Sequence, residues 1–273
     1  MKLMIVVPVY NRQEYVDILA RSLSECNLIG SADIRVYDDC STDFGIEYLE
    51  EKFLPLNAKI KRREKRSWCT ANNYFEMMTD FINSDNDVLF LCDSDLLLRP
   101  DAFEYLEKVF PLTDGFMTLY NSDLHLTVKE GREFDLKLDI GHAAACLSRE
   151  CVSIFLKRNN PGMGDFRLCE TMIKNGVKIL AAKKSYVQHI GVDGKNSSEH
   201  EGMDYSMSFE PLSPHNKEIT DALIPLLIKR QSSLIKRLMF KDKYRRDGFF
   251  LHQPVKSLQR SMTIKKLKKL EVQ

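Results

Sequence analysis

The chain lacks the segments that would direct it into or across a membrane. Its 273 residues include no apolar run long enough to span a bilayer, and the amino terminus has no signal-peptide pattern. The seven cysteines are an odd number and show no C-x-x-C spacing. Cys26, Cys92 and Cys146 stand in apolar runs, as buried reduced thiols do. We therefore expect a cytoplasmic protein.

The chain also lacks internal repeats and low-complexity tracts. A hydrophobic content of 44% over this length is enough for one large domain with an appendage. The net charge of only +1 hides a strong asymmetry, because residues 229–269 carry fourteen Lys or Arg and two Asp. That balance of +12 leaves about −11 for the remaining residues.

Apolar runs alternate with helical patterns along the first hundred residues. This order of strands and helices predicts a mostly parallel sheet with helices on both faces. The expected strands are Leu3–Val7, Ile34–Tyr37, Ala58–Lys61 and Val88–Cys92, and the helix after the second strand is expected at Gly45–Phe53, capped by Ser41, Thr42 or Asp43. The functional loops then lie at one edge of the sheet: Pro8–Arg12, Asp38–Asp43, Arg62–Asn73 and Asp93–Asp95.

Asp93-Ser94-Asp95 directly follows the expected strand Val88–Cys92. Open α/β sheets bind ligands in the crevice at the carboxyl ends of their strands. Carboxylates are hard oxygen ligands for Mg²⁺ or Mn²⁺, which bridge protein to phosphate. The triplet therefore indicates a metal-bound nucleotide diphosphate. A turn in which Asp95 caps the next segment is the alternative.

Three segments together resemble the nucleotide-sugar half of a GT-A glycosyltransferase, most closely the inverting family 2 type: VVPVYNR (6–12), DDCSTD (38–43) and LCDSDLLLRPD (91–101). The resemblance is strong over about the first 110 residues and weaker to about residue 190. It implies an α/β GT-A domain at residues 1–215, with a nucleotide-sugar half at 1–110 and an acceptor half with a lid loop at 111–215. A basic helical tail, 216–273, follows.

The resemblance also implies a set of donor-binding residues. Pro8 and Tyr10 fall where the family lines the uridine pocket, and Asp39 where a carboxylate accepts the uracil N3–H. Arg66 lies in the region where many members of the family place a basic residue near the nucleotide, although the local match is poor. Asp95 is the expected direct metal ligand for Mn²⁺ or Mg²⁺, with Asp93 and His189 completing the site. Asn72 or its neighbour Asn73 matches an asparagine often seen before the next helix. The nucleotide-sugar set is Pro8, Tyr10, Arg12, Asp39, Arg66, Asn72, Asp93 and Ser94.

The family places its catalytic acid at the start of a helix, here expected over Phe166–Asn175. Asp165 is therefore the candidate general base, with helix capping as its alternative role and Glu170 as the rival base. The resemblance implies a single in-line displacement that inverts the anomeric centre. A hairpin between Asn121 and Ile140 is expected to help form the acceptor side.

The tail mixes basic and apolar pairs at helical spacing, which is typical of a basic amphipathic helix on an anionic membrane. The expected activity is transfer from a UDP-sugar to a glycan or lipid-linked acceptor in bacterial surface polysaccharide or lipooligosaccharide synthesis. Two alternatives stay open. One is a phage-type glycosyltransferase that modifies nucleic acid and clamps it with the tail. The other is a non-catalytic protein that binds nucleotide sugar or membrane.

Overall fold

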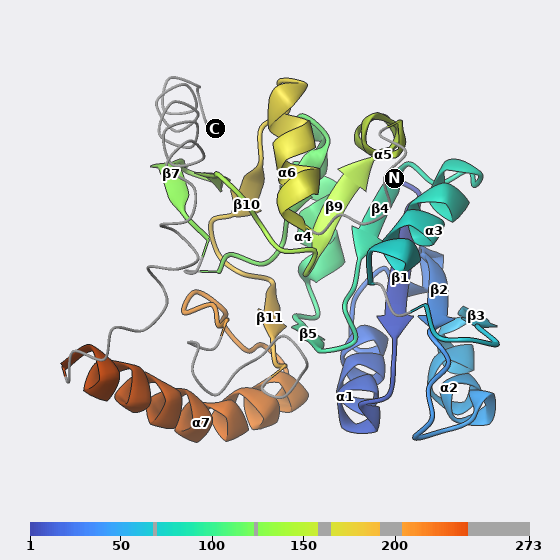
Figure 1. Cartoon of the computed structure of the whole chain (residues 1–273), viewed down its shortest axis with the longest axis horizontal. Coiled ribbons are helices and arrows are strands. Elements are labelled where there is room, and N and C mark those ends of the chain that lie inside the picture. Colours follow the sequence, from blue (N-terminus) through green and yellow to red (C-terminus); the bar gives the residue numbers. More distant parts are fainter. Residues whose placement is uncertain (68–69, 123–124, 158–164, 192–203, 240–273) are drawn as a thin grey trace.

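The computed structural model describes residues 1–67, 70–122, 125–157, 165–191 and 204–239. Within these residues one sheet of nine strands runs through the molecule in the order β3-β2-β1-β4-β9-β6-β10-β8-β7, with helices on both faces (Figure 1). The small sheet β5–β11 stands at the edge where β1 and β4 end. This architecture confirms the α/β fold class expected from the sequence.

The strands are β1 (Leu3–Val9), β2 (Asp33–Asp38), β3 (Lys59–Arg62), β4 (Val88–Leu91), β5 (Leu96–Leu98), β6 (Phe116–Thr118), β7 (Thr127–Glu130), β8 (Phe134–Lys137), β9 (Ala145–Ser148), β10 (Leu180–Ala182) and β11 (Val187–His189). The α-helices are α1 (Gln13–Ser24), α2 (Ile46–Phe53), α3 (Thr70–Ile82), α4 (Ala102–Val109), α5 (Arg149–Leu156), α6 (Asp165–Lys174) and α7 (Pro214–Met239). Short 3₁₀ turns occupy Ile29–Ser31, Leu54–Leu56 and Phe110–Leu112.

The amino-terminal half of the sheet is parallel. β1 pairs with β2 and β4, and β2 pairs with β3, all in parallel. The carboxyl-terminal half is mixed, because β9 lies antiparallel between β4 and β6. The predicted hairpin in residues 121–140 is confirmed as β7 and β8, which pair antiparallel. The loops after the parallel strands therefore share one edge with the loops of the second half.

The strand β1 is apolar on both sides because both faces of the sheet are covered. Ile5 and Val7 pack in the core that includes residues of α1, α2 and α4. Met4 and Val6 pack in the opposite core, with residues of α3, α5 and α6. Burial on both faces fixes the positions of β1 and β4 in the sheet, and thus the positions of the polar residues that follow them.

The predicted capping of α2 is wrong. Its cap is Gly45, with no side-chain capping bond. Ser41 accepts a hydrogen bond from the Asn11 backbone N–H at 2.8 Å, and the Thr42 N–H donates to Asn11 Oδ1 at 2.7 Å. These polar groups tie the β1–α1 loop to the β2–α2 loop instead of capping the helix.

The predicted helical tail begins as α7, which lies across the β11 end of the molecule in Figure 1. The first turn is anchored because Asn216 Nδ2 donates to the Leu98 carbonyl at 3.0 Å. Farther along the helix, Leu223 packs with Leu97 and Ile190. Residues 240–273 lie outside the described part of the chain. None of the described helices is long and apolar enough to cross a membrane.

Candidate active site

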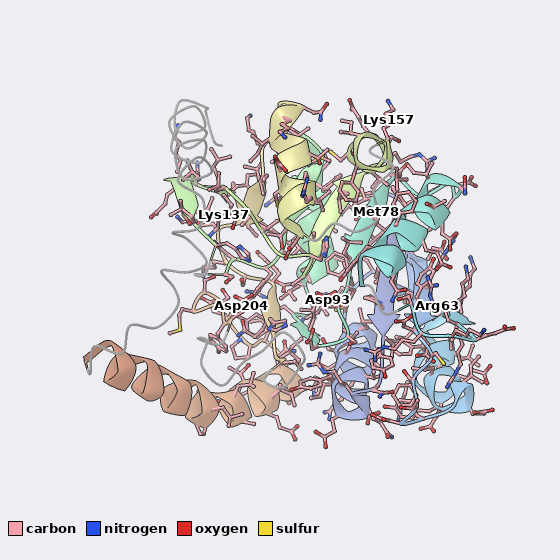
Figure 2. The ribbon with its side chains drawn as sticks, viewed as in Figure 1. Arg63, Met78, Asp93, Lys137, Lys157 and Asp204 are labelled. Carbon is pink, nitrogen blue, oxygen red and sulfur yellow. The ribbon has the colours of Figure 1, made fainter. Side chains whose placement is uncertain are left out.

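Asp95 stands at the centre of a cluster of charged groups at the end of β4. It is only 8% exposed, and its Oδ2 accepts a hydrogen bond from Arg12 Nη1 at 2.8 Å. His189 Nε2 lies 3.4 Å from the same oxygen. The three side chains come from the β1–α1 loop, the β4–β5 loop and β11. Figure 2 shows the neighbouring Asp93 near the middle of the molecule.

The small sheet explains why His189 reaches this place. β11 pairs antiparallel with β5 so that His189 is opposite Leu96, the residue after Asp95. The Ile190 N–H also donates to the Asp95 carbonyl at 2.9 Å. The fold thus brings Asp95 and His189 together, although the two residues are far apart in the sequence.

Asp95 and His189 polarise each other. Burial opposes the charge on Asp95, but His189 and Arg12 outweigh it and hold the pKa of that carboxyl well below its usual range. Burial likewise opposes the charge on His189, but the Asp95 carboxylate outweighs it and raises the pKa of the imidazole to about 9. At neutral pH the pair is therefore a carboxylate facing an imidazolium.

The His189 charge should make the stability of the metal-free protein depend on pH. Because the pKa of His189 in the folded state, about 9, is above its ordinary value of 6.5, this stabilisation is complete below about pH 6.5. It should disappear as the pH rises to about 9, lowering the free energy of unfolding by up to about 3 kcal/mol. Urea unfolding in EDTA measures this, with His189→Gln as the control. Equal pH dependence in the two proteins would contradict the assignment.

Gly191 closes the cluster from the β11 side. A Cβ built on this residue would lie 2.3 Å from Asp95 Oδ2 and 3.0 Å from Arg12 Nη2, distances at which side chains must move. The backbone therefore approaches the carboxylate as only glycine allows. The missing side chain therefore leaves room for the Asp95 carboxylate itself.

Gly191→Ala should displace Asp95 and weaken Mn²⁺-dependent UDP binding by about tenfold or more, the scale seen when metal ligands lose their orientation. Calorimetric titration of UDP with and without Mn²⁺ measures this. Gly30→Ala is a matched control, since a Cβ there meets nothing within 4 Å. Wild-type affinity in Gly191→Ala would show that the backbone approach is not needed for the metal.

A divalent metal fits these residues as a shared site with substrate phosphates. Among the described residues, no group of three His, Cys, Asp or Glu side chains is arranged to hold an ion. Mg²⁺-type sites, however, commonly use one or two carboxylates together with phosphate oxygens and water. Asp95 supplies one ligand, and His189 can supply a second once the bound ion has displaced its proton. His189 Nδ1 is buried without a hydrogen-bond partner in the described chain.

Asp93 belongs to a second cluster that extends to the start of α6. The Tyr74 hydroxyl, from α3, donates to Asp93 Oδ1, and the Tyr74 ring lies 4.1 Å from the His142 ring. Burial, and next the Asp95 charge, raise the pKa of Asp93 to about 6. Asp165 acts electrostatically on Asp93, Tyr74 and His142. The candidate base is therefore within electrostatic range of the candidate metal ligands. Ser94, between Asp93 and Asp95 in the sequence, is buried.

Glu170 lies away from this cluster. Its carboxylate forms a 2.7 Å ion pair with Lys174 on the exposed side of α6. The structure thus brings Asp165, and not the rival residue, to the strand edge.

The candidate nucleotide loops also come together. Asp39 is 7% exposed, and its two oxygens accept hydrogen bonds from the Ser67 N–H at 2.8 Å and the Ser67 hydroxyl at 3.0 Å. The Arg66 guanidinium stacks over the Tyr10 ring at 3.7 Å. Pro8 is half-buried near the end of β1. These residues, from three loops, line one side of the strand edge.

For Asn72 only the backbone is described. It belongs to the first turn of α3, and the side chain lies outside the described part of the structure. The adjacent Asn73 is 6% exposed, and its Oδ1 has no hydrogen-bond partner among the described residues. Asn73 is thus a further polar group at this edge.

Sequence reasoning missed four residues of the site: Tyr74, His142, Gly191 and Asp204. Tyr74 resembles an ordinary apolar position of α3. Asp204 accepts a hydrogen bond from the Tyr120 hydroxyl at 3.0 Å and helps to raise the pKa of His189. The only sequence signal was the glycine after the His189 strand, because the other contacts depend on the tertiary fold.

Several solved structures with bound nucleotide sugars or nucleotides share the fold of this chain. The structure of Staphylococcus aureus TarS 1–349 with UDP-GlcNAc is similar, with a TM-score of 0.53 and 16% identity over 97% of this chain and 79% of that one. Mannosyltransferase PcManGT from Pyrobaculum calidifontis, solved with GDP-Man and Mn²⁺, has a TM-score of 0.52 and 12% identity. The match covers 98% of this chain and 84% of that one. GalNAc-T7 with UDP, GalNAc and Mn²⁺ has a TM-score of 0.57 and 12% identity. The match covers 85% of this chain and 50% of that one. No curated protein matches the chain.

The fold is therefore the GT-A fold of glycosyltransferases. Residues 4–113, less than half of the chain, match the family described as glycosyl transferase family 2. The matched segment contains the three motifs singled out in the sequence, so the resemblance to this family is confirmed over these residues.

Proposed function

We propose that this protein is a metal-dependent, inverting glycosyltransferase that moves a sugar from a UDP-sugar to a hydroxyl of a glycan or lipid-linked acceptor. One observation supports the proposal: Asp93, Asp95 and His189 gather at the carboxyl edge of β4, and Asp165 at the start of α6 acts electrostatically on Asp93. A candidate diphosphate-binding group and a candidate proton acceptor thus belong to one electrostatic cluster. The alternative of a non-catalytic binding protein does not require Asp165 at this place.

The donor is held by its base and its diphosphate. Asp39 keeps acceptor capacity for the uracil N3–H beyond its bonds to Ser67, because a carboxylate offers about four lone-pair sites. Arg12 Nε and Nη2 are buried without hydrogen-bond partners in the described chain. A diphosphate beside Asp95 would supply the anionic partners that these two N–H groups lack.

Asp95 and His189, with Asp93, would hold Mn²⁺ or Mg²⁺ against the two phosphates. The bound ion would supply Lewis-acid stabilisation of the charge that develops on the leaving diphosphate. Arg12 adds a positive charge at the same oxygen of Asp95. Tyr74 holds one oxygen of Asp93 and so fixes the direction of the other.

Asp165 acts as the general base. It takes the proton from the acceptor hydroxyl while that oxygen forms its bond to the anomeric carbon and the bond to the diphosphate breaks. Attack from the face opposite the diphosphate inverts the anomeric centre. His142 is kept neutral at physiological pH, because burial lowers its pKa and Asp165 offsets this only in part.

The acceptor is proposed to lie on an anionic membrane surface, reached through residues 229–269. This rests on the +12 balance of that segment and its interleaved apolar pairs. Deleting the chain from residue 229 should abolish binding to liposomes that contain anionic lipid and preserve UDP binding. The full chain should bind less tightly as salt rises, because surface charges are screened within about 10 Å at 0.1 M. Tight binding to duplex DNA without liposome binding would instead favour nucleic acid as the acceptor.

The proposed function is tested by a donor panel. We expect the wild-type chain to hydrolyse a UDP-sugar slowly without acceptor, only when Mn²⁺ or Mg²⁺ is present, and UDP to compete better than GDP. The panel contains UDP-, GDP- and dTDP-sugars, each with EDTA as the matched control. Preference for GDP would remove the role of Asp39 in base selection, and inactivity with every donor would remove the proposed function.

A further inference from the structure

His125 and Asp139 form a polar pair on the acceptor half that the site described above does not use. His125 Nδ1 lies 2.9 Å from Asp139 Oδ1, and the two side chains are only 17% and 11% exposed. The backbone around His125 is also held in place. Lys137 Nζ, buried on β8, donates to the carbonyls of His125 at 3.1 Å and Ser122 at 3.2 Å.

This pairing sets the direction of the imidazole. The hydrogen bond that one ring nitrogen makes decides the role of the other. With the Nδ1–H donated to the Asp139 carboxylate, Nε2 of the neutral ring is a hydrogen-bond acceptor. The same logic orients histidine beside a carboxylate in many hydrolytic sites. Asp139 is thus a positioning residue for His125.

Nε2 faces the same small space as the proposed base. A Cβ built on Gly141 would lie 3.7 Å from His125 Nε2 and 3.8 Å from both Asp165 Oδ2 and the Ala143 backbone nitrogen. All three atoms therefore border the side of Gly141 where any other residue would carry a side chain. The two side-chain atoms among them accept hydrogen bonds.

We propose that the attacking oxygen of the acceptor is bound in this space, above Gly141 and between Asp165 and His125. The inference rests on the proposed function and extends it. An O–H donor is the group that two acceptor atoms recognise. The proton of the attacking O–H goes to Asp165 as the new bond to the anomeric carbon forms, and the electron pair of the broken bond leaves with the diphosphate. His125 Nε2 accepts a second O–H, from water itself or from the neighbouring hydroxyl of a sugar, and receives no proton.

The test uses hydrolysis of the best UDP-sugar of the donor panel, because water is then the acceptor. His125→Ala and Gly141→Ala should lower kcat by about tenfold to a hundredfold, the scale of a misplaced reacting group, with the donor KM and the UDP Kd unchanged. A methyl at Gly141 makes only ordinary contacts, so this variant should fold, and Gly30→Ala is its matched control. Asp139→Asn should lower kcat in the same direction without changing UDP affinity.

Imidazole in solution separates catalysis from packing. It should restore part of the activity of His125→Ala, because it can occupy the vacated space, and it should not restore Gly141→Ala. Wild-type kcat in His125→Ala overturns the inference alone. Loss of kcat together with loss of UDP affinity, and without rescue by imidazole, also overturns it, because His125 would then be structural. A wild-type chain that hydrolyses no donor removes the proposed function and this inference together.

Discussion

Asp165→Asn is expected to bind UDP with near wild-type affinity and to lose at least about a hundredfold in turnover, the usual effect of removing a general base. Asparagine keeps the shape of the side chain at the start of α6 and its capacity to accept hydrogen bonds. It cannot take up a proton at neutral pH. The loss should therefore appear in kcat, measured as sugar release from the donor, while the metal and diphosphate groups remain in place.

Glu170→Gln is the matched control for this experiment. It removes a carboxylate from the same helix, but from an exposed side chain that pairs with Lys174. Its turnover should equal that of the wild type. Near-normal turnover in Asp165→Asn, or a larger loss in Glu170→Gln, would move the base away from Asp165.

Asp95→Asn should abolish the contribution of Mn²⁺ to UDP binding. Loss of residues that merely orient metal ligands costs 10–100-fold in affinity, so loss of a direct ligand should cost at least about a hundredfold. The substitution also removes the anion that faces Arg12 and His189. The pKa of His189 should then fall, because the carboxylate that raises it is gone.

Calorimetry with UDP, with and without Mn²⁺, measures the effect of Asp95→Asn. Asp114→Asn serves as the control, since it removes a carboxylate paired with Lys178 at 3.8 Å outside the cluster. The two proteins should differ only in the titration that contains Mn²⁺. Unaltered UDP–Mn²⁺ affinity in Asp95→Asn would make the metal-ligand assignment wrong.

The strands that the sequence predicts best are those with local signals. β1, β2 and β4 are apolar runs that end in polar loops, and their two-sided burial is the cause of that pattern. The small sheet of β5 and β11 was harder to predict from the sequence. β11 is only three residues long, and its partner β5 follows Asp95 directly as a short apolar run with no boundary of its own. Pairing between segments this far apart leaves no trace in local periodicity.

The same distinction applies to the site. The positions of Asp93 and Asp95 after a strand, and of Asp165 at the start of a helix, could be predicted because strand ends and helix starts are recognisable in the chain. The place of Tyr74 could not be, because its hydroxyl reaches Asp93 only when α3 packs beside β4. The Asp139–His125 pair was missed for a similar reason: both residues lie in the predicted hairpin, but only the folded register points the imidazole toward Gly141.

The central claim is that this cluster performs one metal-dependent displacement with Asp165 as base. Proton NMR of sugar release from an α-linked UDP-sugar, started by adding Mn²⁺, tests it most directly. We predict that the β anomer forms first, and that Asp165→Asn and EDTA each suppress it. First release of the α anomer, or the same rate of release in EDTA, would contradict the account.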